Sequence, residues 1–380
     1  MNSIDETISI VIDIGSLKSK AGFSGDTVPK YVISSQMGIT QQQPQNENQG
    51  SNQPENDQII MQEENPDKNQ KLNIFGDKNF MKDPQMQIEN VYKNGDIINW
   101  EGYEKLLEEL YDNQLKIQSK DHPLLMAEFS IHNQKQREKL CQLIFEKFNV
   151  PQYFVSKNAA LSSFSAGRST SVVVDLGAYC SMAVPVHDGY IHQKNILKFD
   201  IGGEQVTEKI LQLENFPQQK LSCNSTESYE RYQRHLLARN LKENNTNVLP
   251  DGTQLNIDQN EICDFFFNPH NEILRFKGIH QMVLDCINMW ESELRKQMSS
   301  NVILAGGNAL LFDLEKRFQN KLGEICNKVK YVYYPTVDDR KNSVWIGGSI
   351  LTSLNSFNQL SISKQEYNDN GEFIIEKKCP

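Results

Sequence analysis

The sequence lacks three features that would assign it to a class at once. It has no apolar run long enough to cross a bilayer, and residues 1–6 carry no signal-peptide pattern. Its seven cysteines show no CxxC spacing, which argues against a zinc site and favours free thiols in a reducing compartment. A net charge of −10 argues against a broad basic surface for nucleic acid and leaves room only for a local patch. We therefore expect no membrane contact and a location in the cytosol or the nucleus.

The chain is long enough for a two-lobed body and contains one segment of unusual composition. At 380 residues, with 38% hydrophobic and 23% charged residues, it is too long for one small core. Of the thirty residues from 41 to 70, fifteen are Gln or Asn and none is aromatic. Because such a segment buries too little apolar surface to fold, we expect a disordered insert over about 40–71. A tolerated low-complexity loop and a prion-like function are the two interpretations of it.

Residues 10–23 form the first candidate site, an apolar strand that carries one acid, Asp13, into a Gly-Ser turn. The strand is apolar at consecutive positions, so both of its faces should be covered, and a buried carboxylate there needs a cation or hydrogen-bond donors. Gly15 lets the backbone approach a ligand, and Ser16 and Lys20 can reach phosphate oxygens. Taken alone, the same pattern also fits an ordinary hairpin with a capped turn.

A second copy of this pattern favours ligand binding. Residues 171–181 repeat the order of apolar strand, acid, one apolar residue, glycine and small polar turn. Two such hairpins suggest two related halves that face each other across a ligand. We expect a polyphosphate between them, with its Mg²⁺ held through water near the two acids and no direct metal ligand. The predicted phosphate and magnesium residues are Asp13, Gly15, Ser16, Leu17, Lys20, Asp175 and Gly177.

Two C-terminal runs, over 340–351 and 363–367, add a family resemblance to this pair of hairpins. The sequence resembles actin, within the superfamily that also contains sugar kinases and heat-shock chaperone ATPases. The resemblance implies an α/β, actin-like two-lobed ATPase fold with duplicated ribonuclease-H-like domains around a nucleotide cleft, and ATP with Mg²⁺ as cofactors. The implied parts are a small lobe over 1–165, a large lobe over 166–342 with an outer subdomain at about 202–274, and a return to the small lobe over 343–380.

The resemblance also implies which residues face the adenosine. A Lys-Glu pair at 242–243 copies an actin dipeptide that touches the ring and ribose, but we reject that match because it falls about three helical turns too late. Arg231 and Tyr232 fit the actin spacing from Gly203 better, and Lys341, beside a strand at Trp345, should close the pocket. The predicted adenosine residues are Gly203, Arg231, Tyr232, Gly306, Gly307 and Lys341.

Three positions depart from the actin pattern where actin positions the attacking water. Asn158 stands in place of a Gln, Ala178 in place of an Asp and Met182 in place of a His. Asn is one methylene shorter, and Ala and Met cannot orient a water, while phosphoryl transfer depends mainly on positioning. We therefore predict no catalytic residue, and ATP binding with weak or absent hydrolysis.

The surfaces that actin uses for assembly are altered as well. At the apolar plug after the Phe-x-Pro turn, Asn271 and Glu272 would have to be buried in a filament contact, so we expect no homopolymer. The cleft at the barbed end keeps an apolar lining that suits one amphipathic helix of a partner. Its predicted lining is Phe164, Gly167, Ile350, Leu351, Leu354 and Leu360, of which Leu351 and Leu354 could equally pack the small lobe.

Within the family, the sequence resembles the actin-related protein 4 subfamily. The residues that carry this resemblance are 156–159, 167–170, 185–190, 302–308 and 376–380. It implies a nuclear, ATP-binding scaffold that pairs with nuclear actin on a helicase-SANT-associated helix, in chromatin remodelling or histone acetyltransferase complexes. Contact with nucleosomes or histones stays open. The alternative is a divergent cytoskeletal actin or actin-related protein, located in the cytoplasm, that hydrolyses ATP on assembly.

Overall fold

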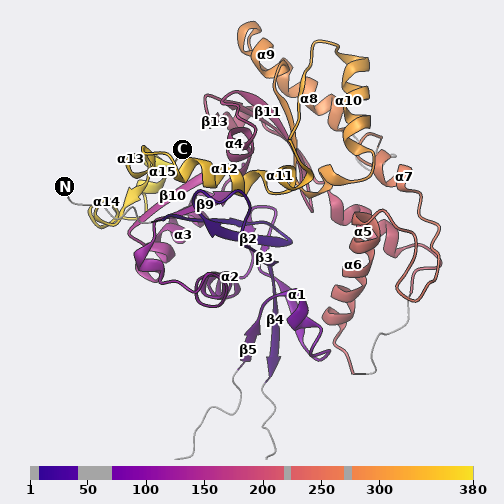
Figure 1. The fold of residues 1–380 in the computed structure, drawn as a ribbon, viewed down its shortest axis with the longest axis horizontal. Coiled ribbons are helices and arrows are strands. Elements are labelled where there is room, and N and C mark those ends of the chain that lie inside the picture. Colours follow the sequence, from indigo (N-terminus) through magenta and orange to yellow (C-terminus); the bar gives the residue numbers. More distant parts are fainter. Residues whose placement is uncertain (1–7, 42–70, 218–223, 269–275, 380) are drawn as a thin grey trace, which may run out of the picture.

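The computed structural model describes residues 8–41, 71–217, 224–268 and 276–379, which form two lobes that each contain a mixed sheet (Figure 1). Most of the expected insert, residues 42–70, and the plug residues Asn271 and Glu272 lie outside the described residues. Within these ranges, no helix combines the length and the apolar character needed to cross a bilayer.

The small lobe is built on a six-stranded sheet in the order β17-β10-β9-β1-β2-β3. Its strand β1 begins with three consecutive apolar residues, Ile10, Val11 and Ile12, and all three are fully buried because both faces of the sheet are covered. Strand β1 pairs antiparallel with β2 through the first hairpin and parallel with β9. The strands are β1 (Ile10–Ile14), β2 (Lys18–Phe23), β3 (Tyr31–Ser34), β9 (Leu124–Glu128), β10 (Gln152–Lys157) and β17 (Ile362–Ser363).

The large lobe repeats this plan around a second sheet, in the order β13-β12-β11-β15-β16 with β14 paired to β12. Strand β11 is the counterpart of β1, because it pairs antiparallel with β12 through the second hairpin and parallel with β15. The fold therefore contains the repetition that the two Asp-x-Gly patterns predict. The strands are β11 (Ser171–Leu176), β12 (Ser181–His187), β13 (Tyr190–Ile191), β14 (Leu197–Phe199), β15 (Val302–Ala305) and β16 (Tyr331–Val332).

Helices cover both sheets, and α4 and α12 pack against each other between the lobes. The small lobe contains α1 (Asp77–Phe80), α2 (Trp100–Glu108), the π-helix η1 (Glu109–Leu115), the 3-10 turn η2 (Ser119–Asp121), α3 (Gln134–Glu146), α4 (Asn158–Ser165), α12 (Ser343–Thr352), α13 (Phe357–Leu360), α14 (Lys364–Asn370) and α15 (Ile374–Lys378). The large lobe contains η3 (Gln193–Asn195), α5 (Gly203–Leu211), α6 (Glu227–Glu243), α7 (Gln259–Asp264), α8 (Ile279–Asn288), α9 (Ser292–Ser299), η4 (Gly307–Leu310), α10 (Leu314–Ile325) and α11 (Val337–Lys341).

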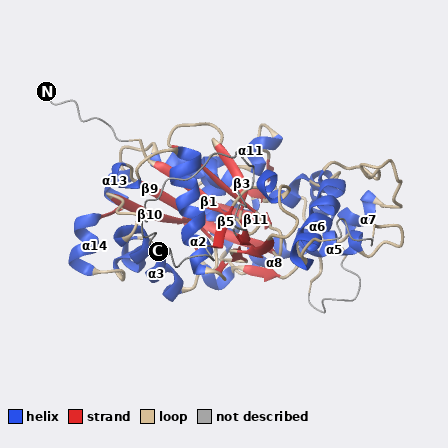
Figure 2. Cartoon of the chain, turned by 90° about the horizontal axis from the view of Figure 1, so that it is seen from below, coloured by secondary structure: helices blue, strands red, loops and turns tan. Residues whose placement is uncertain are grey.

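The outer part of each lobe projects away from its main sheet. On the small lobe this part is a three-stranded sheet of β4 (Gln36–Gln41), β5 (Lys71–Ile74) and β6 (Gln87–Asn90), next to the short hairpin of β7 (Tyr92–Lys93) and β8 (Asp96–Ile97). On the large lobe it consists of α5, α6 and α7, which lie at the opposite end of the molecule from α13 and α14 (Figure 2). Helix α6 packs against strand β6, so the two outer parts touch.

The predicted strand at Trp345 is wrong, because this residue lies in helix α12. Helix α12 is buried on several sides, and its apolar residues therefore follow one another without helical periodicity; such a run cannot be told from a buried strand. The Trp345 indole donates to the carbonyl oxygen of Val11 across 3.0 Å, which ties the returning chain to β1. A Cβ at Gly347 would overlap the backbone of Leu161, so the glycine allows α12 to approach α4 closely.

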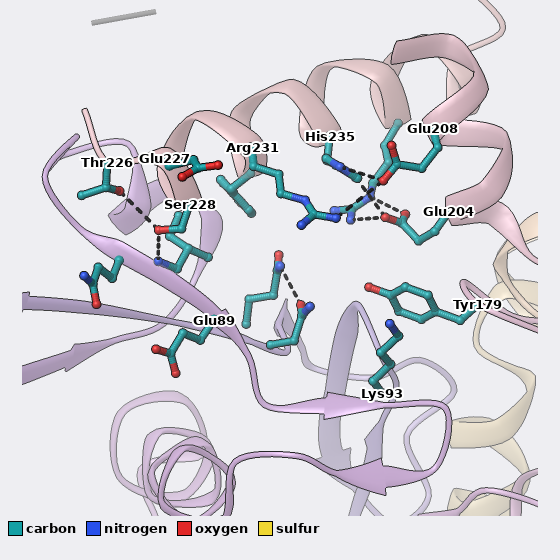
Figure 3. A pocket seen from close by; sticks show the side chains of 16 residues that line it. Glu89, Lys93, Tyr179, Glu204, Glu208, Thr226, Glu227, Ser228, Arg231 and His235 are labelled. Carbon is teal, nitrogen blue, oxygen red and sulfur yellow. Dashed lines mark hydrogen bonds and ion pairs between the residues drawn. The ribbon is translucent and has the colours of Figure 1, made fainter. Parts of the chain in front are cut away.

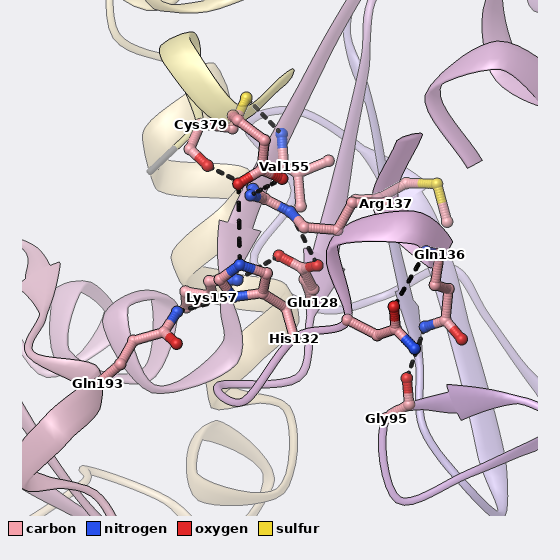
Figure 4. A network of polar contacts seen from close by, with 12 residues as sticks. Gly95, Glu128, His132, Gln136, Arg137, Val155, Lys157, Gln193 and Cys379 are labelled. Carbon is pink, nitrogen blue, oxygen red and sulfur yellow. Dashed lines mark hydrogen bonds and ion pairs between the residues drawn. The ribbon is translucent and has the colours of Figure 1, made fainter. Parts of the chain in front are cut away.

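The C-terminal residues close the small lobe through a buried charge network (Figure 4). Arg137 donates to the backbone carbonyl of Cys379, and its side chain also pairs with Glu128 at 3.0 Å and with Glu376 at 2.8 Å. Glu128 in turn pairs with Lys157 at 2.6 Å, and Lys157 immediately precedes Asn158. The end of the chain is thus anchored to strands β9 and β10.

Candidate functional site

The first hairpin brings an acid and a base together beside its turn. Gly15 donates its N–H to the carbonyl of Lys18 across 3.0 Å and closes the turn. Asp13 and Lys20 face each other in the strand register, with Lys20 Nζ 3.2 Å from Asp13 Oδ2 and each side chain 14% exposed. The Ser16 hydroxyl oxygen accepts from the backbone N–H of Asn94 at 3.1 Å, and its own proton can still be donated.

The second hairpin has the same construction. Gly177 donates its N–H to the carbonyl of Cys180 across 2.9 Å, as Gly15 does to Lys18. Asp175 lies opposite Met182 in the register, at the position that Asp13 occupies in the first hairpin. The sequence pattern of strand, acid, apolar residue and glycine therefore produces one local geometry twice.

The two acids affect each other across the lobes. Burial, and next the neighbouring Asp13 carboxylate, raise the pKa of Asp175 to about 6, against the opposing effects of Lys20 and Asn158. Two carboxylates that share a partly buried site repel each other, so a cation between them, or donors to both, would stabilise the ionised pair. The arrangement is suited to a hydrated divalent cation with a polyphosphate.

Of the three predicted degenerate positions, Asn158 has both ends of its amide engaged. Its Nδ2 donates to Asp175 Oδ2 across 2.9 Å, and its Oδ1 accepts from the Ser130 hydroxyl and from the Ala159 N–H. Met182 is buried among apolar residues of the large lobe and offers no polar atom. The carbonyl of Ala178 accepts from the N–H of Glu204, which joins the turn to helix α5.

The glycines expected beside the adenosine form a continuous backbone surface with the second hairpin. Gly203 donates its N–H to the carbonyl of Gly177 across 3.1 Å. Gly306 has φ +87°, and a Cβ there would lie 2.5 Å from the carbonyl oxygen of Leu176. A Cβ at Gly307 would meet no described atom within 4 Å, so the chain leaves room at this point. The structure thus brings Gly177, Gly203 and Gly306 together.

Arg231 and Tyr232 line a cavity next to this surface, and the adenosine contact predicted for them stays a prediction. The Arg231 side chain is 74% exposed and lies 3.7 Å from Glu208, whereas the Tyr232 hydroxyl donates to Asp77 in the small lobe. Lys242, from the rejected pair, instead donates to the carbonyl of Gly203 at 2.9 Å. Helix α6 runs without interruption from Glu227 to Glu243, and it is its C-terminal end that reaches Gly203.

Lys341 reaches the site through its backbone. Its carbonyl oxygen accepts from Lys20 Nζ across 3.0 Å, and its side chain is exposed at the C-terminal end of α11. Lys20 therefore contacts Asp13 and the segment that leads back into the small lobe. The adenosine contact predicted for the Lys341 side chain stays a prediction.

A cavity of about 620 Å³ lies next to these glycines, between β6 and helices α5 and α6 (Figure 3). On its large-lobe side, Glu204 accepts from Arg239 at 2.8 and 2.9 Å and lies 3.1 Å from His235 Nδ1. Burial alone would raise the pKa of Glu204, but the hydrogen bonds from His235 and Arg239 outweigh it and lower that pKa to about 2. On the opposite side, Lys93 of the small lobe lies over the Tyr179 ring at 4.6 Å from the centroid.

The sequence pattern did not predict this charged cluster of Glu204, His235 and Arg239. Its signal was present, because His235 and Arg239 stand four residues apart and so share one face of a helix. Glu204 follows Gly203 directly, at the start of α5. The sequence could place Glu204 beside His235 and Arg239 only with knowledge of how helix α6 packs against helix α5.

The residues predicted to hold a partner helix differ in exposure. Ile350 is 44% exposed, Leu354 50% and Leu360 39%, so these three present apolar surface. Leu351 is only 8% exposed and packs into the core cluster that contains Val11 and Trp345, so it cannot serve as a surface anchor. The burial of Leu351 fits the alternative interpretation, that it packs the small lobe. Phe164 is half-buried and Gly167 is exposed with φ +67°.

Comparison with known proteins identifies the family of this chain. The family model described as actin matches residues 4–248 and 226–380. The chain belongs to the actin family. The resemblance seen in the sequence and the predicted actin-like two-lobed α/β fold are therefore confirmed.

Actin-family relatives named actin-related protein 4 match along their whole length. The proteins of Oryza sativa, in the indica and japonica subspecies, are each 31% identical over 440 residues, which covers 99% of this chain and 99% of theirs. The protein of Arabidopsis thaliana is 31% identical over 437 residues, again with 99% of both chains covered. This chain is thus an actin-family protein similar to actin-related protein 4.

Nucleotide binding is a general property of the actin family, and the residues present here fit it. The paired acids Asp13 and Asp175 suit a hydrated divalent cation, and Lys20 and the two turns suit phosphate oxygens. The buried ammonium of Lys242 and the open space beside Gly307 suit the nucleoside end.

Proposed function

We propose that this protein binds ATP with Mg²⁺ as a structural ligand and acts as a nuclear scaffold subunit. In this role it pairs with nuclear actin on a helicase-SANT-associated helix, within a chromatin remodelling or histone acetyltransferase complex. The full-length similarity to proteins named actin-related protein 4 supports the assignment.

The phosphates would lie between the two hairpin turns. Gly15, Ser16 and Leu17 would face them from the small lobe and Gly177 from the large lobe, with Lys20 neutralising part of their charge. Asp13 and Asp175 would hold the magnesium through water. When bound, the metal would neutralise the phosphate charge and relieve the repulsion between the two carboxylates.

The structural role proposed for the nucleotide rests on the surroundings of Asn158. The amide of Asn158 is held by Ser130, Ala159 and Asp175, and neither Ala178 nor Met182 supplies a polar side chain in its place. Hydrolysis requires a positioned water, and positioning supplies most of the catalysis in phosphoryl transfer. The site therefore favours retention of ATP over its turnover.

The exposed apolar residues on α12 and α13 support a partner helix at this end of the small lobe. Ile350, Leu354 and Leu360 are at least 39% exposed, beside the half-buried Phe164. An amphipathic helix would cover such residues with its apolar face.

The test is purification of the tagged protein from its own cells, with mass spectrometry of the partners and chromatography of the extracted nucleotide. We expect actin and a helicase-SANT or acetyltransferase scaffold, and ATP in excess of ADP. Recovery with ADP alone, or pelleting of the pure protein as a polymer, would instead support a divergent cytoskeletal actin.

A further inference from the structure

We propose that Ser130 is a positioning residue that restrains the hydrolysis of bound ATP, because its hydroxyl occupies the acceptor atom of the Asn158 amide. This role rests on the proposed binding of ATP at the same site. It gives one buried side chain of the small lobe the task of keeping the nucleotide intact.

The carbonyl oxygen of the Asn158 side chain has no lone pair left for a water. An amide oxygen of this kind can accept two hydrogen bonds. Asn158 Oδ1 accepts one from the Ser130 hydroxyl and one from the Ala159 N–H, the latter across 2.9 Å. The amide nitrogen faces the other way and donates to Asp175 Oδ2 across 2.9 Å. The partners fix this orientation, because the Ala159 N–H needs an acceptor and the carboxylate needs a donor.

Of the two donors to Asn158 Oδ1, Ser130 is the one that acts through a side chain. The Ala159 N–H belongs to the first turn of helix α4 and comes with the fold. Ser130 is 0% exposed, and a buried hydroxyl keeps its hydrogen-bond partner because no bulk water replaces it. The restraint on the amide therefore depends on the residue type at position 130.

The loop between β9 and α3 holds Ser130 in place from both sides (Figure 4). Before Ser130, Glu128 pairs across 2.6 Å with Lys157, the residue directly before the held amide. After it, His132 Nδ1 lies 2.7 Å from Gln193 Nε2 of the large lobe. Because the loop is fastened to strand β10 and to the large lobe, the hydroxyl stays aimed at the amide.

Hydrolysis needs a water that is held by an acceptor. In this reaction the water oxygen bonds to the γ-phosphorus while the bond from that phosphorus to the β–γ bridging oxygen breaks. ADP leaves with the bridging oxygen and its electron pair, one water proton stays on the inorganic phosphate and the other passes to solvent. Positioning of the water supplies most of the catalysis. Of positions 158, 178 and 182, only Asn158 carries a polar side chain, and Ser130 keeps its acceptor occupied.

The experiment compares native protein with Ser130→Ala, each loaded with ATP and Mg²⁺ and freed of unbound nucleotide. Chromatography of the bound nucleotide over time gives the rate at which ATP becomes ADP. We expect this rate to rise about two- to tenfold in Ser130→Ala, the effect of one neutral hydrogen bond. The matched control is Ser163→Ala, which removes an equally buried hydroxyl that donates to the carbonyl of Arg168 at 2.7 Å, and it should keep the native rate.

Two further measurements show whether Ser130 acts through Asn158. In the Asn158→Ala background, Ser130→Ala should no longer change the rate, since the amide that it holds is gone. In the nucleotide-free protein, hydrogen exchange of the Ala159 N–H should be about twofold or more faster in Ser130→Ala, because its acceptor is then less firmly held.

The outcomes separate this restraint from the proposed function. If ATP is bound but Ser130→Ala hydrolyses it at the native rate, or if the variant has the same effect with and without Asn158, the restraint is overturned and the proposed function stands. If the chain retains no nucleotide, the proposed function and the restraint fail together. Equal exchange of the Ala159 N–H in native protein and Ser130→Ala would show that Ser130 does not hold the amide, and would overturn the restraint without any nucleotide.

Discussion

Lys242 donates to the carbonyl oxygen of Gly203 across 2.9 Å while its side chain is almost fully buried. Burial lowers the pKa of Lys242 to about 8, against the opposing effects of the Glu204 and Glu243 carboxylates. Burial of a cation costs free energy, and an anionic ligand beside it would offset part of that cost. Lys242, next to Gly203, and the predicted pair Arg231 and Tyr232, on the cavity wall, are therefore two alternative positions for the adenosine contact.

Substitutions of Lys242 and Arg231 compare the two possible registers of the adenosine contact. Lys242→Met should weaken ATP binding about tenfold or more, because it removes a buried donor and charge. Arg231→Met, on a side chain that is 74% exposed, should leave the affinity within about twofold. Isothermal titration with ATP and Mg²⁺ at pH 7 gives both values. The opposite order of effects would restore the register based on Arg231.

Loss of both hairpin acids should abolish nucleotide retention. Asp13→Ala combined with Asp175→Ala removes the groups that would hold the hydrated magnesium. The measurement is the nucleotide that stays with the protein through a desalting column. Asp285→Ala, on an exposed helix position, is the control and should retain nucleotide as the native chain does. Equal retention by the double variant would refute the site.

Gly306 should tolerate a side chain less well than Gly252. Both glycines have φ +87°, so alanine at either position adds backbone strain of about 1–2 kcal/mol. At Gly306 the added Cβ would also lie 2.5 Å from Leu176 O and 2.6 Å from Asp175 Oδ1, whereas at Gly252 it meets no described atom within 4 Å. Urea unfolding should show the larger loss for Gly306→Ala, by about 1–3 kcal/mol. Equal losses would contradict the close packing around Gly306.

The stabilisation from Glu204 should depend on pH. Its pKa is about 2 in the folded protein against an ordinary value of 4.5, so its contribution is fully present above pH 4.5 and is lost as the pH falls towards 2. The shift corresponds to about 3 kcal/mol at pH 7. The difference in unfolding free energy between native protein and Glu204→Gln should therefore shrink by about 1 kcal/mol between pH 7 and pH 3.5. A difference that stays constant or grows would exclude the ion pair as its source.

Leu354 and Leu351 should separate partner binding from stability. Leu354→Asp changes a side chain that is 50% exposed, so the isolated variant should melt near the native temperature and lose its scaffold partner on co-purification. Leu351→Asp places a charge in the core and should lower the melting temperature itself. If Leu354→Asp still co-purifies normally, the partner helix docks elsewhere.

The sequence predicted best those parts of the site whose residues are close together in the chain. Each acid lies two residues before the glycine of its turn, as in Asp13 and Gly15 and in Asp175 and Gly177. The acid and the turn are therefore found together in a short stretch of sequence. Because the pattern occurs twice, it also predicted two facing halves, and the resemblance to actin implied the overall fold. The exposed Ile350 and Leu354 were predicted correctly as apolar surface positions only through the resemblance to actin.

Long-range register could not be predicted in this way. Counting from Gly203 did not show that helix α6 reaches this glycine through Lys242 in its last turn. The choice between a cleft position and a core position for Leu351 stayed open in the sequence, because an apolar helix buried on several sides gives no amphipathic pattern. The cluster of Glu204, His235 and Arg239 depends on two helices that only the folded chain brings together.

The anchoring of the C-terminal residues sets an order for folding during synthesis. The large lobe is formed by one uninterrupted stretch of chain, whereas the core of the small lobe includes Ile12 from one end and Ile362 and Ile375 from the other. Trp345 and Arg137 make their contacts only once the last part of the chain has left the ribosome. The small lobe is therefore the last to be completed. The apolar residues of its strand β1 stay exposed and prone to aggregation for most of translation.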